Sequence, residues 1–278
     1  MLAAVNDEAL FDLEVRLLLE ALFQRYQHDF RNYAMASVRR RVRQAMQRLA
    51  CQRVADLQHL VLHEPEAFAQ ALPFFTVQVS EMFRDPAYFL ALREHVVPIL
   101  RTYPSLKIWV AGCGNGEEVW SLAILLAEEG LLDRTLVYAT DINPQALRTG
   151  ESATCETRRV CGFSKNYQAA GGTGSLSDYY SSAYGRAVFD HRLRKHVVFA
   201  DHSLATDAVF SEVHLVSCRN VLIYFNAGLQ DRAIGLFREA LVHRGFLGLG
   251  SRESLRFGVH ADAFEPVVAA QKLFRKKA

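Results

Sequence analysis

A strand, a glycine-rich turn and a helix are predicted in direct succession between residues 108 and 126, and they constrain the fold more than any other part of the chain. Residues 108–111 (Ile-Trp-Val-Ala) are an apolar run of strand length, Gly112, Gly114 and Gly116 form the turn, and apolar residues recur at helical spacing from Leu122 onward. Glycines let the backbone turn tightly and let a ligand approach without Cβ atoms in the way, and the following helix offers its positively polarised N-terminus. The pattern indicates an α/β domain that binds a nucleoside-type cofactor.

The spacing of the glycines distinguishes between such cofactors. The dinucleotide fingerprint Gly-x-Gly-x-x-Gly needs a third glycine where this chain has Glu117, which Glu118 follows. Two carboxylates at this place suit a cofactor that carries cationic and hydroxyl groups better than one that carries phosphates. S-adenosylmethionine, with its ammonium, sulfonium and ribose hydroxyls, is such a cofactor. A second apolar run, residues 136–139, is followed by Asp141. An acidic residue at the end of the second strand is where such folds bind the hydroxyls of a ribose. A turn without any ligand is one alternative, and a nicotinamide-dependent dehydrogenase, which the missing glycine disfavours, is another.

Composition and charge exclude several other classes of protein. The 278 residues suffice for one large and one smaller domain, and the formal net charge of +2 argues against bulk binding of nucleic acid. No apolar run reaches membrane-spanning length, and the acidic N-terminus lacks the layout of a signal peptide, so we expect a cytoplasmic protein without membrane insertion. Five cysteines without a Cys-x-x-Cys pair suggest neither a disulfide framework nor a metal site.

Helical periodicity dominates the first part of the chain and predicts a helical domain over residues 1–75. Its first helix ends at a polar gap at residues 27–29, and one apolar face is predicted from Leu10, Leu13, Val15, Leu17, Leu18, Leu22 and Phe23.

A second predicted helix, from residue 37 to 49, is rich in arginine. Val38, Val42, Ala45 and Leu49 fall on one face, and Arg39, Arg40 and Arg43 cluster on the other. A solvated surface is the simple interpretation of such a charge run, and a docking surface for an acidic partner is the alternative.

Residues 76–90 are predicted to link the two domains and to line the cofactor cleft. Asp85 and Pro86 should open a helix, with the Asp85 carboxylate as its N-cap and Pro86 at the first helical position. Apolar residues at helical spacing continue this helix to Leu100.

The α/β domain is expected over residues 91–278, with an insertion at about 151–194. The insertion is rich in glycine and tyrosine and has few helical repeats, which predicts loops and short strands. Strands resume at 197–200 and 213–217, and a helix (229–242), a strand (246–249) and an antiparallel hairpin near 264–274 follow. Ligands of open α/β sheets bind outside the carboxyl ends of the strands, so Arg219, Asn220 and Tyr224 should lie at the same edge as Gly112 and Asp141.

Four stretches together resemble the CheR-type chemotaxis receptor methyltransferases. They are residues 111–118 (Ala-Gly-Cys-Gly-Asn-Gly-Glu-Glu), 139–141 (Ala-Thr-Asp), 218–225 (Cys-Arg-Asn-Val-Leu-Ile-Tyr-Phe) and 250–255 (Gly-Ser-Arg-Glu-Ser-Leu). The resemblance covers nearly the whole chain, and the 218–225 run is its most specific part. It implies a Rossmann-like S-adenosylmethionine-dependent methyltransferase sheet with an N-terminal all-helical domain and a small inserted β subdomain. It also implies an enzyme that esterifies glutamate side chains on the cytoplasmic helical bundle of chemoreceptors and releases S-adenosylhomocysteine, and we expect it to be a monomer.

The same resemblance implies the residues of the site. The family's Asn-x-Thr-x-Phe-Phe-Arg segment falls on Gln78, Ser80, Met82, Phe83 and Arg84, its turn acid on Glu118, its ribose aspartate on Asp141, and its Asn-Leu pair on Ser203 and Leu204. With these, Ala111, Gly112, Arg219 and Asn220 complete the expected cofactor site, Arg84 and Tyr224 are expected beside the transferred methyl, and Arg39, Arg40 and Arg43 would dock the receptor helix. Three positions depart from the family: Gln78 is longer than the usual asparagine, Ser203 replaces an amide, and His214 stands where an aspartate is usual.

The expected chemistry depends on alignment rather than on acid–base catalysis. A glutamate carboxylate is already ionised near neutral pH and needs no general base. Holding it in line with the methyl group, at near-attack distance, makes the displacement effectively intramolecular. Two alternatives stay open, namely a methyltransferase of this fold with another protein or a small molecule as acceptor, and a non-enzymatic signalling module that binds S-adenosylmethionine.

Overall fold

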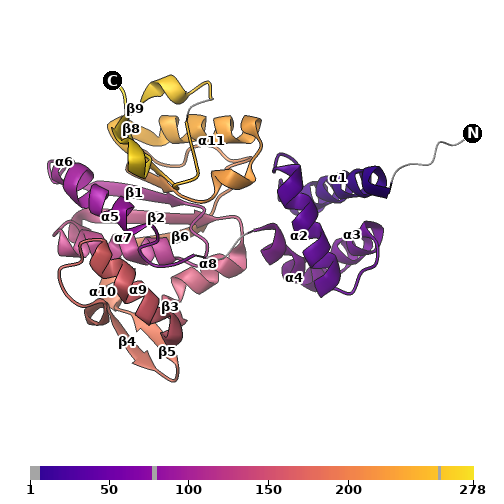
Figure 1. Ribbon diagram of the computed structural model, residues 1–278, viewed down its shortest axis with the longest axis horizontal. Coiled ribbons are helices and arrows are strands. Elements are labelled where there is room, and N and C mark those ends of the chain that lie inside the picture. Colours follow the sequence, from indigo (N-terminus) through magenta and orange to yellow (C-terminus); the bar gives the residue numbers. More distant parts are fainter. Residues whose placement is uncertain (1–6, 77–79, 256–257) are drawn as a thin grey trace, which may run out of the picture. The chain divides into compact units, whose positions relative to one another are not determined.

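The chain divides into two compact units (Figure 1). The computed structural model describes residues 7–76, 80–255 and 258–278. One unit contains the N-terminal helices together with residues 224–230, and the other contains the remaining described residues. The helical unit therefore includes a distant segment that the expected domain of residues 1–75 did not contain.

Four helices form most of the helical unit: α1 (Asp7–Tyr26), α2 (Met35–Arg48), α3 (Val54–His63) and α4 (Pro65–Phe75). The segment 224–230 is bound to the α1–α2 connection through its backbone. The N–H of Ala34 donates to the carbonyl of Tyr224 at 2.8 Å, and the N–H of Asn226 donates to the carbonyl of Asn32 at 2.9 Å. These bonds fix the position of Tyr224 within the helical unit.

The first helix, α1, is apolar on two opposite faces. Val15, Leu18 and Leu22 are fully buried, whereas Leu10, Leu13 and Leu17 are between 45% and 54% exposed. At about 100° per residue, positions 10, 13 and 17 lie on the side of the helix opposite to positions 15, 18 and 22. The prediction of a single apolar face was wrong, because two separate stripes had been combined into one.

The larger unit contains a seven-stranded sheet in the order β6-β2-β1-β7-β8-β10-β9. The first five strands in this order run parallel, and β10 and β9 are antiparallel to their neighbours. The strands are β1 (Leu106–Ala111), β2 (Thr135–Asp141), β6 (Val197–Asp201), β7 (Val213–Cys218), β8 (Leu241–Leu249), β9 (Phe264–Val268) and β10 (Leu273–Lys276). The predicted α/β class and the antiparallel end of the sheet are confirmed.

Helices cover both faces of this sheet. Ile108 and Val110 on β1 belong to one large core cluster with α7 (Glu117–Glu128), while Trp109, which points to the other face, lies edge-on to Phe237 of α11 (Ala227–Ala240) with ring centroids 5.4 Å apart. A strand buried on both sides needs apolar residues at successive positions, which explains the continuous apolar run of β1.

A continuous helical segment follows Pro86, but it is not a uniform α-helix. It consists of α5 (Pro86–Ala91), a π-helical turn (Leu92–Val96) and α6 (Val97–Leu100), and the N–H of Val97 reaches back five residues to the carbonyl of Leu92. Pro98 has no N–H to offer to the carbonyl of Glu94, and its ring would crowd that carbonyl in an α-helical turn. The wider π turn relieves this conflict.

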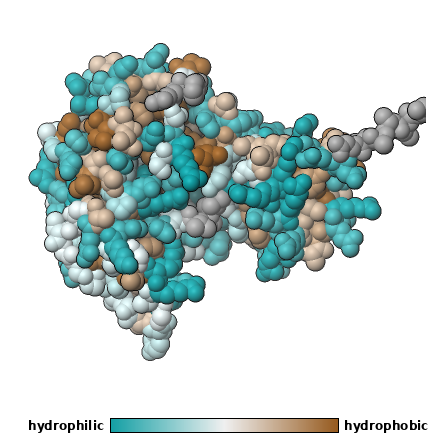
Figure 2. All heavy atoms as spheres, in the orientation of Figure 1, coloured by the Kyte–Doolittle hydropathy of each residue, from teal (hydrophilic) through white to brown (hydrophobic). Residues whose placement is uncertain are grey.

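The insertion forms a small antiparallel sheet in the order β3-β5-β4, with β3 (Thr154–Glu156), β4 (Tyr180–Ala183) and β5 (Arg186–Phe189). This sheet confirms the predicted β subdomain, and its visible end is mostly white in Figure 2, so neither strongly hydrophilic nor strongly hydrophobic. The insertion also contains a 13-residue helix, α9 (Thr157–Ala169), which the sequence analysis missed. Val160, Phe163 and Tyr167 are its only buried residues, too few for a clear apolar stripe.

The remaining regular elements are short. They are α8 (Pro144–Glu151), α10 (His191–Arg194) and the 3₁₀ turns at Leu132–Arg134, Leu176–Tyr179, Leu222–Tyr224, Ala261–Ala263 and Ala269–Gln271. Within the described ranges, no helix is long and apolar enough to cross a membrane.

A buried carboxylate, that of Glu128, joins α9 to the rest of the larger unit. Its side chain is 2% exposed and is bound by the Tyr167 hydroxyl, by the Arg93 guanidinium and by Thr173, whose N–H lies at 3.1 Å. Burial raises the pKa of Glu128, but the hydrogen bonds from Tyr167 and Arg93 outweigh burial, and the net pKa is lowered from 4.5. A carboxyl whose pKa is lower in the folded state than in the unfolded state stabilises the fold at pH values above its unfolded-state pKa. This stabilisation is lost as the pH falls through the folded-state pKa.

The Glu128→Gln variant is therefore expected to be less stable than the wild type by about 2 kcal/mol at pH 7, since it loses charge-assisted hydrogen bonds. The difference between the two free energies of unfolding should shrink as the pH falls below 4.5. Urea denaturation at several pH values measures it, with Glu94→Gln at an exposed site as the control. A difference that is constant with pH would contradict the assignment.

Candidate active site

The glycine turn after β1 is held in shape by Asp141, at the end of β2. Gly112, Gly114 and Gly116 have φ angles of 70°, 54° and 90°, a region that residues with a Cβ rarely adopt. The Asp141 carboxylate accepts the N–H of Gly114 and the N–H of Asn143, each at 2.9 Å. Burial raises the pKa of the Asp141 carboxyl, and these two hydrogen bonds act against that rise. Asp141 thus lies beside the glycine turn, where the sequence placed it, and its oxygens stabilise the turn itself.

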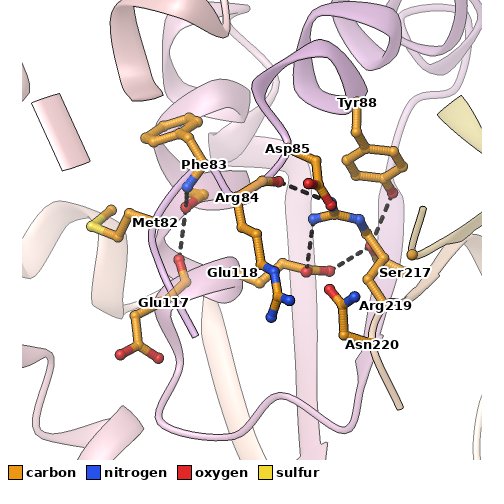
Figure 3. Close-up of polar contacts among 12 residues, drawn as sticks. Met82, Phe83, Arg84, Asp85, Tyr88, Glu117, Glu118, Ser217, Arg219 and Asn220 are labelled. Carbon is orange, nitrogen blue, oxygen red and sulfur yellow. Dashed lines mark hydrogen bonds and ion pairs between the residues drawn. The ribbon is translucent and has the colours of Figure 1, made fainter. Parts of the chain in front are cut away.

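A buried ion-pair cluster lies at the ends of β7 and α7 (Figure 3). The Glu118 carboxylate accepts a hydrogen bond from the Ser217 hydroxyl at 2.6 Å and pairs with the Arg219 guanidinium at 3.1 Å. The Ser217 hydroxyl also lies 2.9 Å from that of Tyr88. This cluster binds the first turn of α7 to the carboxyl end of β7.

Arg219 has a larger structural role than the sequence analysis gave it. Its side chain is 1% exposed, it donates to the carbonyl of Arg84 at 2.8 Å and to the carboxylate of Asp85 at 2.9 Å, and it lies 4.1 Å from the ring centroid of Tyr88. With its side chain enclosed in this way, Arg219 could contact a cofactor only through its backbone. The predicted N-cap bond of Asp85 is wrong: Asp85 occupies the N-cap position with Pro86 after it, but its carboxylate makes no cap hydrogen bond and pairs with Arg219 instead.

Arg84 is presented from a strained and well-anchored backbone. Phe83 and Asp85 on either side of it have φ angles of 50° and 55°, which is uncommon for residues other than glycine. The N–H of Phe83 donates to the Ser121 hydroxyl at 2.8 Å, and Arg219 holds the Arg84 carbonyl. In Figure 3 no dashed line reaches the Arg84 guanidinium, and within the described residues this group makes no hydrogen bond or ion pair. The backbone is fixed while the cationic group stays available.

Glu253 is a site-supporting residue to which the sequence analysis gave no role. It is 4% exposed, and its carboxylate accepts four backbone N–H groups at 2.5 to 3.1 Å, from Gly250, Asn220, Val221 and Leu222. Burial raises its pKa, and these N–H groups counteract the rise. Glu253 thereby fixes the loop after β7, including Asn220, whose φ is 61°. Glu253 lies in the 250–255 motif, and this was the feature of the sequence that could have indicated its role.

Three other expected cofactor residues, Ala111, Ser203 and Leu204, end or follow strands at this edge, whereas His214, which departs from the family but was not expected to bind the cofactor, does not. Ala111 ends β1 beside Gly112, and Leu204 is 6% exposed. The Ser203 hydroxyl accepts the N–H of Ala205 at 3.3 Å, so it shapes its own turn. His214 accepts the N–H of Lys107 at Nδ1, near the opposite end of β1 from the glycine turn. Gln78 lies outside the described residues.

Tyr224 belongs to the helical unit, where Arg41 lies against it. The Arg41 guanidinium is 4.3 Å from the centroid of the Tyr224 ring and donates to the carbonyl of Phe75 at 2.6 Å. Arg41 is 2% exposed, and burial lowers the pKa of its guanidinium. Neither of the two predicted faces of α2 included Arg41.

The three arginines of the expected docking surface are not equivalent. Arg39 forms a two-pronged ion pair with Asp12 on α1, and the Arg43 guanidinium lies 4.5 Å from the ring centroid of Phe11. Arg40 is exposed and has no ion-pair partner in the described part of the chain. Arg40 and Arg43 are thus both exposed without an ion-pair partner among the described residues, and Arg40 has no ring contact either.

The groups that remain at the edge of the sheet fit a nucleoside-type ligand with a charged amino acid part. The positive-φ glycines leave their positions in the turn before α7 without Cβ atoms, and among the described residues the Ser80 hydroxyl and the Asn220 amide make no side-chain hydrogen bond. Hydroxyl and amide groups are suited to binding ribose hydroxyls and an ammonium or carboxylate.

Comparison with known proteins agrees with this arrangement. Residues 78–272 match the CheR methyltransferase, SAM (S-adenosylmethionine) binding domain, and residues 13–76 match the CheR methyltransferase, all-alpha domain. A Pseudomonas putida protein named "Putative methyltransferase Cher3" is 56% identical over 265 residues, which cover 95% of this chain and 97% of that protein. A chemotaxis protein methyltransferase of Listeria monocytogenes is 29% identical over 66% of this chain and 68% of its own length. An uncharacterized 104.1 kDa protein of Rhodobacter capsulatus is 30% identical over 82% of this chain, but that match spans only 24% of its length. The chain therefore belongs to the CheR methyltransferase family and carries both the all-helical domain and the SAM-binding domain of that family.

Proposed function

We propose that the protein transfers the methyl group of SAM to glutamate side-chain carboxylates of chemoreceptors, giving glutamate methyl esters and S-adenosylhomocysteine. The family and the relative named as a chemotaxis protein methyltransferase support this acceptor class. The observation that carries the proposal is the guanidinium of Arg84, which has no partner among the described residues although its backbone is fixed on both sides.

The availability of the Arg84 guanidinium favours an anionic acceptor. The Arg219 guanidinium is already paired with the carboxylates of Glu118 and Asp85, whereas the Arg84 guanidinium has no ion-pair partner among the described residues. An unmatched guanidinium recognises a carboxylate through charge-assisted hydrogen bonds.

The residues have to align the reactants rather than activate them. SAM, when bound, supplies a methyl group made electrophilic by the sulfonium. The glycine turn and Asn220 would hold the cofactor, and Arg84 would hold the acceptor carboxylate, which is ionised at neutral pH and requires no base. Tyr224 would direct its hydroxyl toward the methyl or the attacking oxygen.

Methyl transfer to a receptor fragment tests the function. Purified protein is incubated with labelled SAM and the cytoplasmic helical fragment of a chemoreceptor, and the labelled product is treated with base. A base-labile methyl on glutamate supports the proposal. A base-stable product indicates another acceptor group, and SAM binding without any transfer indicates a non-enzymatic signalling module.

The Tyr224→Phe variant is expected to lower turnover by about five- to tenfold, the value of one hydrogen bond, while SAM affinity stays nearly unchanged. The ring is retained, so its packing against Arg41 should survive. Single-turnover kinetics and a SAM titration measure the two quantities. Tyr26→Phe, which removes a hydroxyl bound to the carbonyl of Val61 in the same unit, is the control. Unchanged turnover would remove Tyr224 from the mechanism.

Reversing the charge of Arg40 tests the docking surface. The Arg40→Glu variant should raise the KM for the receptor fragment at least severalfold, most clearly at low ionic strength, and should leave SAM affinity intact. Arg16→Glu makes the same change in net charge at an exposed site on α1. Equal effects of the two variants would mean that only the overall charge matters.

A further inference from the structure

The inserted subdomain supplies a helix to the segment that carries Arg84. On α9, Arg159, Phe163, Asn166 and Tyr167 are spaced four, seven and eight residues from the first, so they share one face of the helix. Three of them contact residues 80–83.

The contacts from α9 are directed at the backbone of that segment. Arg159 donates to the carbonyl of Ser80, and the side-chain amide of Asn166 donates to the carbonyl of Met82 at 3.1 Å. The rings of Tyr167 and Phe83 meet edge to face, with centroids 5.3 Å apart. Main-chain hydrogen bonds constrain the path of the chain, whichever side chains it carries.

Arg159 also connects this segment to the glycine turn. Its guanidinium pairs at 2.8 Å with the carboxylate of Glu117, the first residue of α7, whose side chain is 7% exposed. The same guanidinium lies 4.9 Å from the ring centroid of Phe163, one turn further along α9. One side chain therefore bridges the start of the cofactor helix and the start of the Arg84 segment.

The segment needs such support because its conformation is unfavourable. Left-handed φ angles at Phe83 and Asp85 persist only where surrounding contacts impose them. Ser121 and Arg219 hold one side, and α9 holds the other. If one side is removed, the backbone around Arg84 can relax and its guanidinium can leave its position.

We propose that α9 is the positioning element for Arg84 and that Arg159 is its positioning residue, so that the inserted subdomain takes part in methyl transfer without touching the reactants. This proposal rests on the proposed role of Arg84 as the residue that binds the acceptor carboxylate.

Amide hydrogen exchange and kinetics on the full-length protein test the proposal together. The Arg159→Met variant should increase exchange at the Phe83 amide and should lower turnover by about tenfold, since one charge-assisted hydrogen-bond pair is lost, while SAM affinity changes less than about threefold. Arg159→Lys should restore part of the turnover, because an ammonium can reach one of the two partners. Arg158→Met is the matched control, since Arg158 is the preceding residue on α9, is 82% exposed and pairs only with Glu156 among the described residues.

The possible outcomes separate this proposal from the proposed function. Unchanged exchange at Phe83 in Arg159→Met overturns the positioning role, as does faster exchange with unchanged turnover, or an equal effect of Arg158→Met. If Arg84→Ala itself leaves turnover intact, the role of Arg84 fails, while the exchange result still decides whether α9 holds the segment. Should Arg159→Met fail to fold, Asn166→Ala removes only the contact to Met82 and is expected to give the same changes at smaller size.

Discussion

Replacing Arg84 with alanine is expected to lower methyl transfer by about 100-fold, a loss of about 2 to 3 kcal/mol of transition-state stabilisation. The guanidinium has no structural partner among the described residues, so its removal leaves the fold intact. The backbone contacts of Arg84, through the Phe83 N–H and the Arg84 carbonyl, do not depend on its side chain. The loss should therefore appear in turnover and in the KM for the receptor fragment, and SAM affinity should fall less than either.

Two comparisons make this expectation specific. Arg84→Lys keeps the positive charge but loses the forked geometry of the guanidinium. Its turnover should therefore lie between that of the wild type and that of Arg84→Ala. Arg148→Ala removes an exposed arginine of α8 that is bound to Gln145, and it should have no effect. Wild-type turnover in Arg84→Ala, with the thermal midpoint unchanged, would show that another group binds the acceptor.

The largest effect on stability is expected for Glu253→Ala, with a loss of about 3 to 5 kcal/mol in the free energy of unfolding. Four backbone N–H groups would lose their common acceptor at once, and the hydrogen bonds of two of them, Gly250 and Leu222, are buried. Added bulk is poorly tolerated there, because a Cβ at Gly250 would lie 2.7 Å from the backbone nitrogen of Asn220. Urea denaturation monitored by circular dichroism measures the change.

A matched control is available for this variant. Glu265→Ala removes an exposed carboxylate from β9 and should change stability by less than about 0.5 kcal/mol. The stability of Glu253→Gln should lie between those of the wild type and Glu253→Ala. The amide oxygen of the glutamine can accept backbone N–H groups, but its NH2 group is a donor and cannot. If Glu253→Ala were as stable as Glu265→Ala, the four hydrogen bonds would have to be replaced by water.

The sequence determined the features that depend on local pattern. Apolar runs followed by glycine or by Asp141 were sufficient to predict β1, β2 and the turn between sheet and helix, because strand length and backbone freedom are local properties. The motif of residues 218–225 was sufficient to indicate the family, since it combines several residue types at fixed spacing.

Only the tertiary structure decided which partners these residues have. Arg219 binds the carbonyl of Arg84, 135 positions earlier in the chain, and thereby takes Asp85 away from its expected cap. Arg159 reaches Ser80 across 79 positions from a helix whose apolar pattern was too weak to detect. Side-chain spacing shows which residues can share a face of one element, but the pairing of charges depends on which elements the fold brings together, and that is set by packing of the whole core.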